Sequence, residues 1–168
     1  QRVPSVAIAI VRAGELTSSR GYRLAYVARN RPVTNETSFN IGSTSKSISA
    51  WVVMALVSSR RIDLDAPVNR YLKRWKLPRS SFDNEQVTVR RALSHTAGLS
   101  VRGYHGVHVP GDSLPTLVGS LNGYSGSDGA LRVVRKPAKT FEYSSGGYTL
   151  LQLLVEDVTG ESFSDFVR

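Results

Sequence analysis

The alternation and clustering of apolar residues predict a strand-rich start followed by a longer helix-rich part. Val6–Val11 is a short apolar run, and Leu16–Val27 is a second run interrupted by Gly21. Between them lies Arg12–Glu15, in which Gly14 can take the positive φ angle that a tight hairpin turn requires. The pattern therefore predicts two adjacent antiparallel strands.

The longest helical pattern lies in the middle of the sequence. It runs from about Thr44 to Ser59 and is apolar on nearly every side, which is typical of a helix in the interior of a protein. Arg60 and Arg61 follow it, and cations suit the C-terminal end of a helix dipole. We therefore expect a buried central helix.

Other helices are predicted around a region rich in Gly, Ser and His, residues 100–129, and the segment Phe141–Gly147 is interpreted as a loop. One short helix is expected to begin near Pro67, and a second after the N-cap Thr88. A third is expected near Leu114–Leu121. A longer helix should contain Leu150 to Val158 and end at Gly160, and a last one should follow over Glu161–Arg168. Two strands make a poor sheet, because a lone hairpin is only marginally stable. The inventory therefore predicts an α/β protein of the α+β type, whose antiparallel sheet is flanked by helices and is incomplete in this chain.

We expect one incomplete domain over residues 1–168. Residues 1–40 would supply the N-terminal strands of its sheet and residues 41–168 its mostly helical part. The length suits a single domain. The remaining strands are expected beyond residue 168 or on another chain.

The net charge of +9 permits nucleic acid or an acidic surface as partner. The basic residues are scattered, however, and no aromatic stacking platform is interleaved with them. A solvated basic surface is the preferred interpretation, with no nucleic-acid partner. The chain contains no cysteine, which excludes disulfides, thiolate nucleophiles and cysteine metal sites. No apolar run reaches the length of a membrane span.

Candidate chemistry lies at the start of the central helix. Ser43 and Lys46 are three residues apart, so they would share one helix face. A serine hydroxyl is a poor nucleophile until a neighbouring base takes its proton. Lys46 can be that base if burial and the helix N-terminus lower its pKa. A single Ser-x-x-Lys also arises by chance, as an N-cap followed by a surface lysine.

Two alternatives use the histidines. His95 could be the base of a Ser-His-Asp triad, but the chain has no Gly-x-Ser-x-Gly elbow. His105 and His108, together with Asp112, could bind a metal. However, they lie in a glycine-rich segment, and Asp112 is not a clear third ligand. An exposed loop is the preferred interpretation, and no metal or organic cofactor is expected.

Four segments, taken in their order, resemble the N-terminal part of serine hydrolases of the β-lactamase/penicillin-binding-protein superfamily. The resemblance is to the branch of class C β-lactamases, esterases and D-amino-acid peptidases. The segments are Ser43–Lys46, Leu93–Leu99, Tyr143–Ser145 and Gly147–Leu151. The resemblance implies a β-lactamase/transpeptidase-like fold and a periplasmic or secreted location.

The resemblance also assigns roles. Ser43 would be the acylated nucleophile, Lys46 and Tyr143 the bases, and Ser145 a substrate-binding residue; the segment around His95 would be structural. The implied function is hydrolysis of an ester, amide or β-lactam carbonyl in a small molecule or peptide through an acyl-enzyme. The alternatives are a penicillin-binding D-Ala-D-Ala carboxypeptidase or transpeptidase, and a non-catalytic binding relative.

The sequence departs from the family pattern at two places. Ser145 stands where the family usually has Asn, and a hydroxyl cannot make the paired contacts of an amide. The Lys/His-x-Gly strand that would supply one oxyanion-hole donor is absent. Loss of one such donor costs roughly 100- to 1000-fold in rate. The isolated chain should therefore be inactive, and we expect a complementing C-terminal segment or second chain as its partner.

Overall fold

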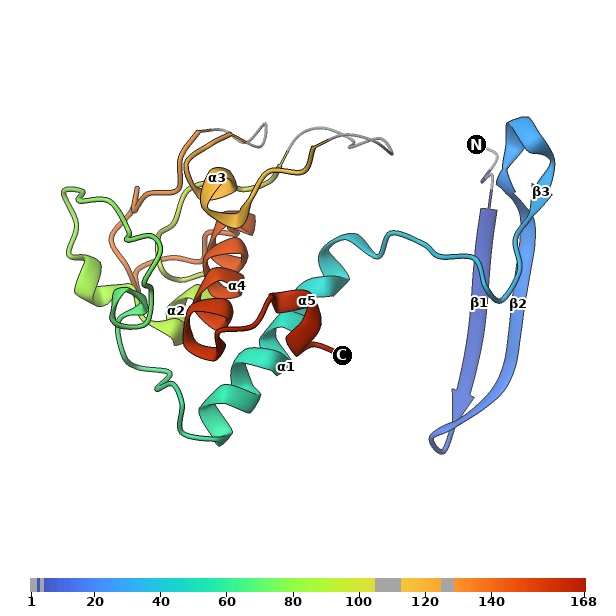
Figure 1. The fold of residues 1–168 in the computed structure, drawn as a ribbon, viewed down its shortest axis with the longest axis horizontal. Coiled ribbons are helices and arrows are strands. Elements are labelled where there is room, and N and C mark those ends of the chain that lie inside the picture. Colours follow the sequence, from blue (N-terminus) through green and yellow to red (C-terminus); the bar gives the residue numbers. More distant parts are fainter. Residues whose placement is uncertain (1–2, 4, 105–112, 125–128) are drawn as a thin grey trace. The chain divides into compact units, whose positions relative to one another are not determined.

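The computed structural model describes residues 3, 5–104, 113–124 and 129–168 (Figure 1). They divide into two compact units, residues 1–42 and residues 43–168. The first contains strands and the second contains all five α-helices of the described residues.

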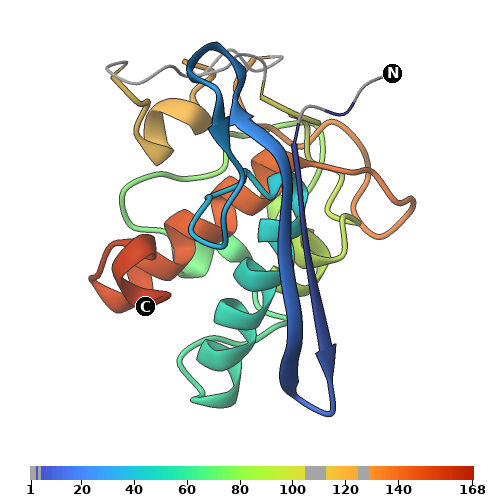
Figure 2. The ribbon, with the colours of Figure 1, turned by 90° about the vertical axis from the view of Figure 1, so that its right-hand side faces the viewer.

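The first unit is a β-hairpin extended by a short third strand (Figure 2). Strands β1 (Ser5–Arg12) and β2 (Glu15–Tyr26) pair antiparallel, and β3 (Arg31–Pro32) pairs with β2 after the 3₁₀ turn Val27–Arg29. Ala13 and Gly14 have φ angles of 50° and 85°, as a tight turn between twisted strands requires. The predicted strands and turn are confirmed. β3 was not predicted, since a two-residue strand has no periodicity to detect.

The hairpin unit has almost no interior of its own. Among its described residues, Val33 alone is buried. Gly21, which interrupted the predicted second strand, lies directly against it: a Cβ on Gly21 would be 2.5 Å from the carbonyl oxygen of Val33. This glycine therefore permits a close backbone approach and does not end the strand.

The second unit is built around helix α4. The helices are α1 (Ser45–Ser58), α2 (Val89–Leu93), α3 (Leu117–Leu121), α4 (Ser145–Thr159) and α5 (Phe163–Phe166), with 3₁₀ turns at Gly42–Thr44, Val68–Arg70 and Asn84–Gln86. Helix α4 contacts all four other helices, and nine of its 15 residues are buried. None of the helices in the described part of the chain is long and apolar enough to cross a bilayer.

Helix α4 begins at Ser145, inside the segment Phe141–Gly147 that was predicted to be a loop. Ser144 is its N-cap: the hydroxyl accepts a hydrogen bond from the Gly147 N–H at 2.9 Å and donates one to the carbonyl oxygen of Ser100 at 2.5 Å. A side-chain acceptor at this position satisfies one of the unpaired N–H groups at the start of a helix. The loop prediction holds for Phe141–Ser144 and is wrong for Ser145–Gly147, because Ser144 acts as a helix cap.

The adjacent glycines had also suggested a loop, but tertiary packing explains them. A Cβ on Gly146 would lie 2.7 Å from Cδ1 of Leu131 and 2.8 Å from Cβ of Val101. Contacts this short are forbidden, so the first turn of α4 approaches its neighbours only because this side chain is missing. The sequence alone does not reveal such a contact.

Helix α1 is less buried than predicted. Its buried residues are Ser49, Val53 and Leu56. On another face of the helix, Trp51 is 77% exposed and Met54 is 43% exposed. The prediction of a helix buried on every side is therefore wrong for the described residues. Apolar composition identified the helix correctly, but it did not reveal how much of its surface is covered.

Candidate active site

Ser43, Lys46 and Tyr143 lie together at the N-terminal end of α1. The Ser43 Oγ is 2.8 Å from the Tyr143 phenolic oxygen, and the Lys46 Nζ donates a hydrogen bond to the same Oγ at 3.2 Å. Tyr143 is a hundred residues away in sequence. The fold therefore brings together three of the four residues that the sequence selected.

Local helix geometry aligns the first two residues. Ser43 lies in the 3₁₀ turn that precedes α1, and Lys46 lies in the first turn of the helix, so their side chains share a face. Ser43 is exposed, whereas Lys46 is half-buried. The Lys46 Nζ is 5.1 Å from the ring centroid of Tyr143 and 5.7 Å from that of Tyr148. Two aromatic faces thus hold this cation beside the serine.

The electrostatic surroundings of Tyr143 favour its ionised form. The hydrogen bond with Lys46, followed by that with Ser43, lowers the pKa of the Tyr143 phenol, against the opposing effect of burial. A phenolate next to a serine hydroxyl can accept its proton. The arrangement is therefore chemically suited to activating Ser43.

Ser145 donates its hydroxyl proton to the carbonyl oxygen of Arg102 at 2.9 Å. The Ser145 hydroxyl is also one of the smaller influences that lower the pKa of Tyr143. One hydroxyl proton cannot serve both acceptors at once, and we assign it to Arg102 because that bond has a defined geometry. In this state Ser145 can offer a substrate only an acceptor.

An ion-pair cluster fixes the segment that carries Tyr143. The Glu142 carboxylate pairs with Arg102, whose Nε lies 3.1 Å away, and with Arg135, whose Nε lies 3.0 Å away. The hydrogen bond from Arg102 is the main cause that lowers the pKa of Glu142. The side chain before Tyr143 is thus held from two directions.

His95 lies beside Tyr143, with a ring-centroid distance of 4.5 Å. Its Nδ1 accepts a hydrogen bond from the backbone N–H of Ser144 at 3.1 Å. In a Ser-His-Asp triad a carboxylate would accept from that nitrogen, so the observed bond is opposite in direction. The structure gives the triad hypothesis no support.

His105, His108 and Asp112, the residues of the alternative metal site, lie outside the described residues. Across the ranges that are described, no group of three or more His, Cys, Asp or Glu side chains is arranged to hold a metal ion.

The whole chain, residues 1–168, matches the family model described as Beta-lactamase. The chain belongs to the beta-lactamase family. The resemblance inferred from its four segments is therefore confirmed. Protein flp of Staphylococcus aureus (strain NCTC 8325 / PS 47) is 24% identical to it over 165 residues, which are 98% of this chain and 32% of that protein. The chain thus spans only about 32% of the length of this curated relative.

Solved structures of the family have the same fold. D-amino acid amidase from Ochrobactrum anthropi SV3, complexed with L-phenylalanine amide, has a TM-score of 0.79 and 30% identity, covering 99% of this chain and 43% of that chain. The octameric penicillin-binding protein homologue from Pyrococcus abyssi has a TM-score of 0.73 and 28% identity, covering 98% of this chain and 37% of that chain. The predicted β-lactamase/transpeptidase-like fold is confirmed as a partial version of it.

Sequence reasoning missed Tyr148 in this beta-lactamase family chain. Its ring packs beside Lys46 and His95, and its hydroxyl donates to the carbonyl oxygen of Leu93 at 3.0 Å. This bond joins α4 to the segment that contains His95. The available signal was that both segments belong to the motif set that also contains Ser43 and Tyr143.

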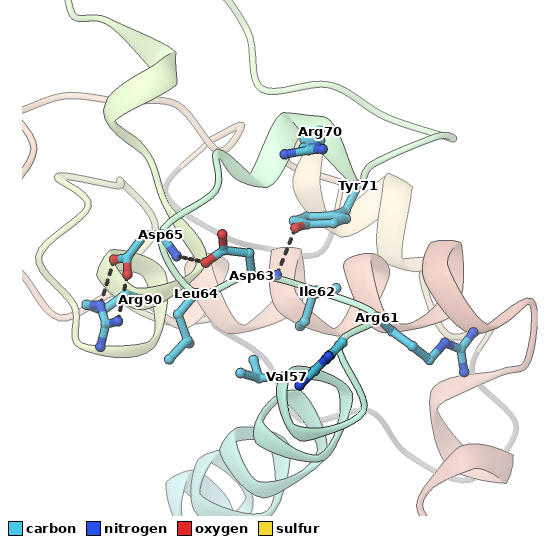
Figure 3. Close-up of a pocket in the computed structure, with 10 residues that line it drawn as sticks. Val57, Arg61, Ile62, Asp63, Leu64, Asp65, Arg70, Tyr71 and Arg90 are labelled. Carbon is cyan, nitrogen blue, oxygen red and sulfur yellow. Dashed lines mark hydrogen bonds and ion pairs between the residues drawn. The ribbon is translucent and has the colours of Figure 1, made fainter.

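A separate cavity of about 610 Å³ lies at the opposite end of α1 (Figure 3). Two of the arginines that line this cavity, Arg90 and Arg61, already make hydrogen bonds within the chain. Arg90 binds Asp65 through two bonds of 2.7 and 2.8 Å, and Arg61 points away to donate to the carbonyl oxygen of Val158 at 2.7 Å. The lining residues are Val57, Arg60, Arg61, Ile62, Asp63, Leu64, Asp65, Arg70, Tyr71 and Arg90. They include no serine, so this cavity is separate from the candidate catalytic site at Ser43.

Proposed function

We propose that this chain is the nucleophile-bearing part of a serine hydrolase that acts on an ester, amide or β-lactam carbonyl through an acyl-enzyme. One observation carries the proposal: the Tyr143 phenolic oxygen lies 2.8 Å from the Ser43 Oγ, while Lys46 donates to that Oγ. A nucleophile and a base within hydrogen-bond reach, with a third group that orients them, are typical of covalent catalysis.

In the proposed reaction, the Ser43 Oγ attacks the carbonyl carbon while its proton moves to the ionised Tyr143. The tetrahedral intermediate collapses when the carbonyl–leaving-group bond breaks, and the leaving group takes the proton from Tyr143. Water then attacks the acyl-enzyme carbonyl while Tyr143 accepts its proton; the acyl–Oγ bond breaks, Tyr143 returns that proton to the Ser43 Oγ, and the acid product leaves. The Lys46 ammonium keeps Tyr143 ionised between these steps.

Two groups would stabilise the oxyanion. One is the backbone N–H of Ser43, and the other is expected from strands that are not part of residues 1–168. We therefore propose that residues 1–168 belong to one domain that is completed by another segment or chain. The low coverage of the relatives, such as 32% of Protein flp, supports this proposal.

Ser145 and the similar proteins support a preference among these substrate classes. Because the Ser145 hydroxyl donates to Arg102, it is a poor replacement for an amide clamp on a β-lactam. A similar structure is a D-amino acid amidase that was solved with an amide, which supports an amide or ester substrate. A D-Ala-D-Ala carboxypeptidase or transpeptidase is the alternative within enzymes. A non-catalytic relative is the alternative from another class, favoured by the same Ser145 bond.

The test uses the full-length protein with a chromogenic ester, an amino-acid anilide and a chromogenic cephalosporin. We expect turnover of the ester or anilide to exceed that of the cephalosporin, and Ser43→Ala to abolish it. Ser47→Ala, an exposed serine in the first turn of the same helix, is the matched control and should retain wild-type rates. Absence of both turnover and covalent labelling in the wild type would refute the enzyme proposal.

A further inference from the structure

The sequence motif around His95 has no role in the proposed reaction, yet three aromatic rings surround this side chain. Its ring centroid lies 4.5 Å from that of Tyr143, 5.2 Å from that of Tyr148 and 5.6 Å from that of Phe141. The rings of Tyr143 and His95 are tilted by 35°, so the imidazole covers part of one phenol face. Packing on this scale restricts how the phenol can turn.

Two hydrogen bonds to His95 also enclose Tyr143 along the backbone. The N–H of Glu142 donates to the His95 carbonyl oxygen at 2.7 Å, and the N–H of Ser144 donates to the His95 Nδ1 at 3.1 Å. The residues immediately before and after Tyr143 are thus both bonded to the same residue. Any side chain at position 95 leaves the first bond possible, whereas the second needs an acceptor at the Nδ1 position.

The backbone of His95 is held in a sparsely populated conformation. Its φ angle is 57°, in the left-handed region that residues other than Gly occupy uncommonly, Asn, Asp and His more often than most. Such conformations persist where the surrounding structure fixes them, and they cluster at functional sites. The conformation places both the carbonyl oxygen and the imidazole of one residue against the Tyr143 segment.

The charges around His95 favour its neutral form. The titratable groups that face His95 are Lys46 from α1, Tyr143 from the segment before α4, and Tyr148 from α4. Burial, followed by the positive charge of Lys46, lowers the pKa of His95. A neutral imidazole whose Nδ1 accepts a hydrogen bond carries its proton on Nε2. This tautomer is the one that the Ser144 bond requires.

We propose that His95 is a positioning residue that sets the orientation of Tyr143 toward Ser43, through its ring and through the acceptor that it offers to Ser144. This inference rests on the proposed function, in which Tyr143 is the base. His95 acts only through Tyr143 and takes no proton from Ser43.

Two variants of the full-length protein separate its two contributions. His95→Phe keeps a ring but removes the acceptor, whereas His95→Asn keeps an acceptor and suits a left-handed φ angle but removes the ring. For ester hydrolysis we expect kcat of His95→Phe to fall by about 10- to 100-fold, because small displacements of a catalytic group cost this much. KM should stay within about threefold, because substrate binding is not altered. The acidic limb of the pH–rate profile, which reports ionisation of the base Tyr143, should shift to higher pH, and His95→Asn should recover part of the loss.

Arg74→Ala is the control for destabilisation alone, since Arg74 pairs with the buried Asp157 on the far half of α4. It should lower the melting temperature without moving the pH–rate profile. The inference is overturned if both His95 variants keep the wild-type rate and profile, or if their rates fall only as the Arg74→Ala rate does. Retained activity in Ser43→Ala would instead refute the proposed function.

The protonation state of His95 can be measured on the wild-type protein, so this test does not depend on whether a variant folds. Nitrogen NMR of His95 at neutral pH should show Nδ1 unprotonated and Nε2 protonated. A protonated Nδ1 would remove the acceptor for Ser144 and overturn the inference.

Discussion

Two helices bring the candidate site together, and they are held in very different ways. Helix α4 buries nine of its 15 residues and has a side-chain cap at Ser144. Helix α1 buries three of its 14 residues, and its N-cap Thr44 makes no side-chain capping hydrogen bond. The base therefore precedes the well-packed helix, and the nucleophile precedes a helix with a large exposed face.

This contrast explains how the site depends on its surroundings. His95, Glu142 and Ser144 hold Tyr143 within the helical unit. Ser43 and Lys46 move with α1, on which Trp51 is 77% exposed. A catalytic geometry is only as precise as the shell that supports it. The distance between nucleophile and base thus depends on what packs on α1.

The largest effect is expected at the base. Tyr143→Phe removes the phenolic oxygen 2.8 Å from Ser43 and should lower kcat/KM for ester hydrolysis by about 100- to 10,000-fold, the usual contribution of a general base. Tyr124→Phe, at a tyrosine that is 81% exposed, is the matched control and should retain full activity. A Tyr143→Phe enzyme with wild-type rates would show that another group takes the proton.

The next effect compares the cores of the two helices by chemical unfolding of the 168-residue chain. Leu150→Ala removes a fully buried α4 side chain and should lower the free energy of unfolding by about 2–5 kcal/mol. Trp51→Ala removes a larger side chain from α1 but should change it by less than about 0.5 kcal/mol, because surface substitutions rarely do more. Equal losses would mean that the face of α1 that bears Trp51 is covered, and the comparison would fail.

A smaller difference is expected at the two N-caps. Ser144→Ala removes the acceptor for Gly147 and should lower the free energy of unfolding by about 0.5–2 kcal/mol. Thr44→Ala removes no capping bond and should change it by less than about 0.5 kcal/mol. Thermal denaturation of both variants measures the difference. A Thr44→Ala loss as large as that of Ser144→Ala would contradict the assignment of a weaker cap to α1.

The smallest effect is in the titration of Tyr143. Its pKa is lowered mainly by the hydrogen bond with Lys46, so it should ionise below about pH 10, the ordinary value for tyrosine. The folded state then binds the proton less tightly than the unfolded state. The resulting stabilisation is complete above about pH 10 and is lost as the pH falls through the folded pKa. Tyrosinate absorbance of the wild type minus that of Tyr143→Phe measures the midpoint, and a value above 10 would contradict the account.

Much of the fold could be predicted because its signals are local. The hairpin turn at Gly14 and the stop of α4 at Gly160 both use left-handed glycines, with φ angles of 85° and 82°, whose requirements are visible in sequence. The start of α4 could not be predicted, because Gly146 is explained by contacts with residues distant in sequence. The exposure of α1 was missed for the same reason.

The residues of the candidate site could likewise be predicted only where the signal was local or came from the family resemblance. Ser43 and Lys46 were found from helix spacing, and Tyr143 from the family resemblance. The two hydrogen bonds from the Tyr143 segment to His95 join residues 47 or more positions apart, one to its backbone carbonyl oxygen and one to its imidazole Nδ1. The sequence does not reveal that residues so far apart are bonded. The bond from Ser145 to Arg102 was equally invisible in the sequence.

Covalent labelling of Ser43 tests the central claim most directly. The full-length protein is incubated with a slowly hydrolysed penicillin and with a fluorophosphonate ester, and is then digested and mapped by mass spectrometry. We predict one added acyl or phosphonyl group on the peptide that contains Ser43, none in Ser43→Ala, and much slower labelling in Tyr143→Phe. An adduct on another residue, or labelling that survives Ser43→Ala, would contradict the account.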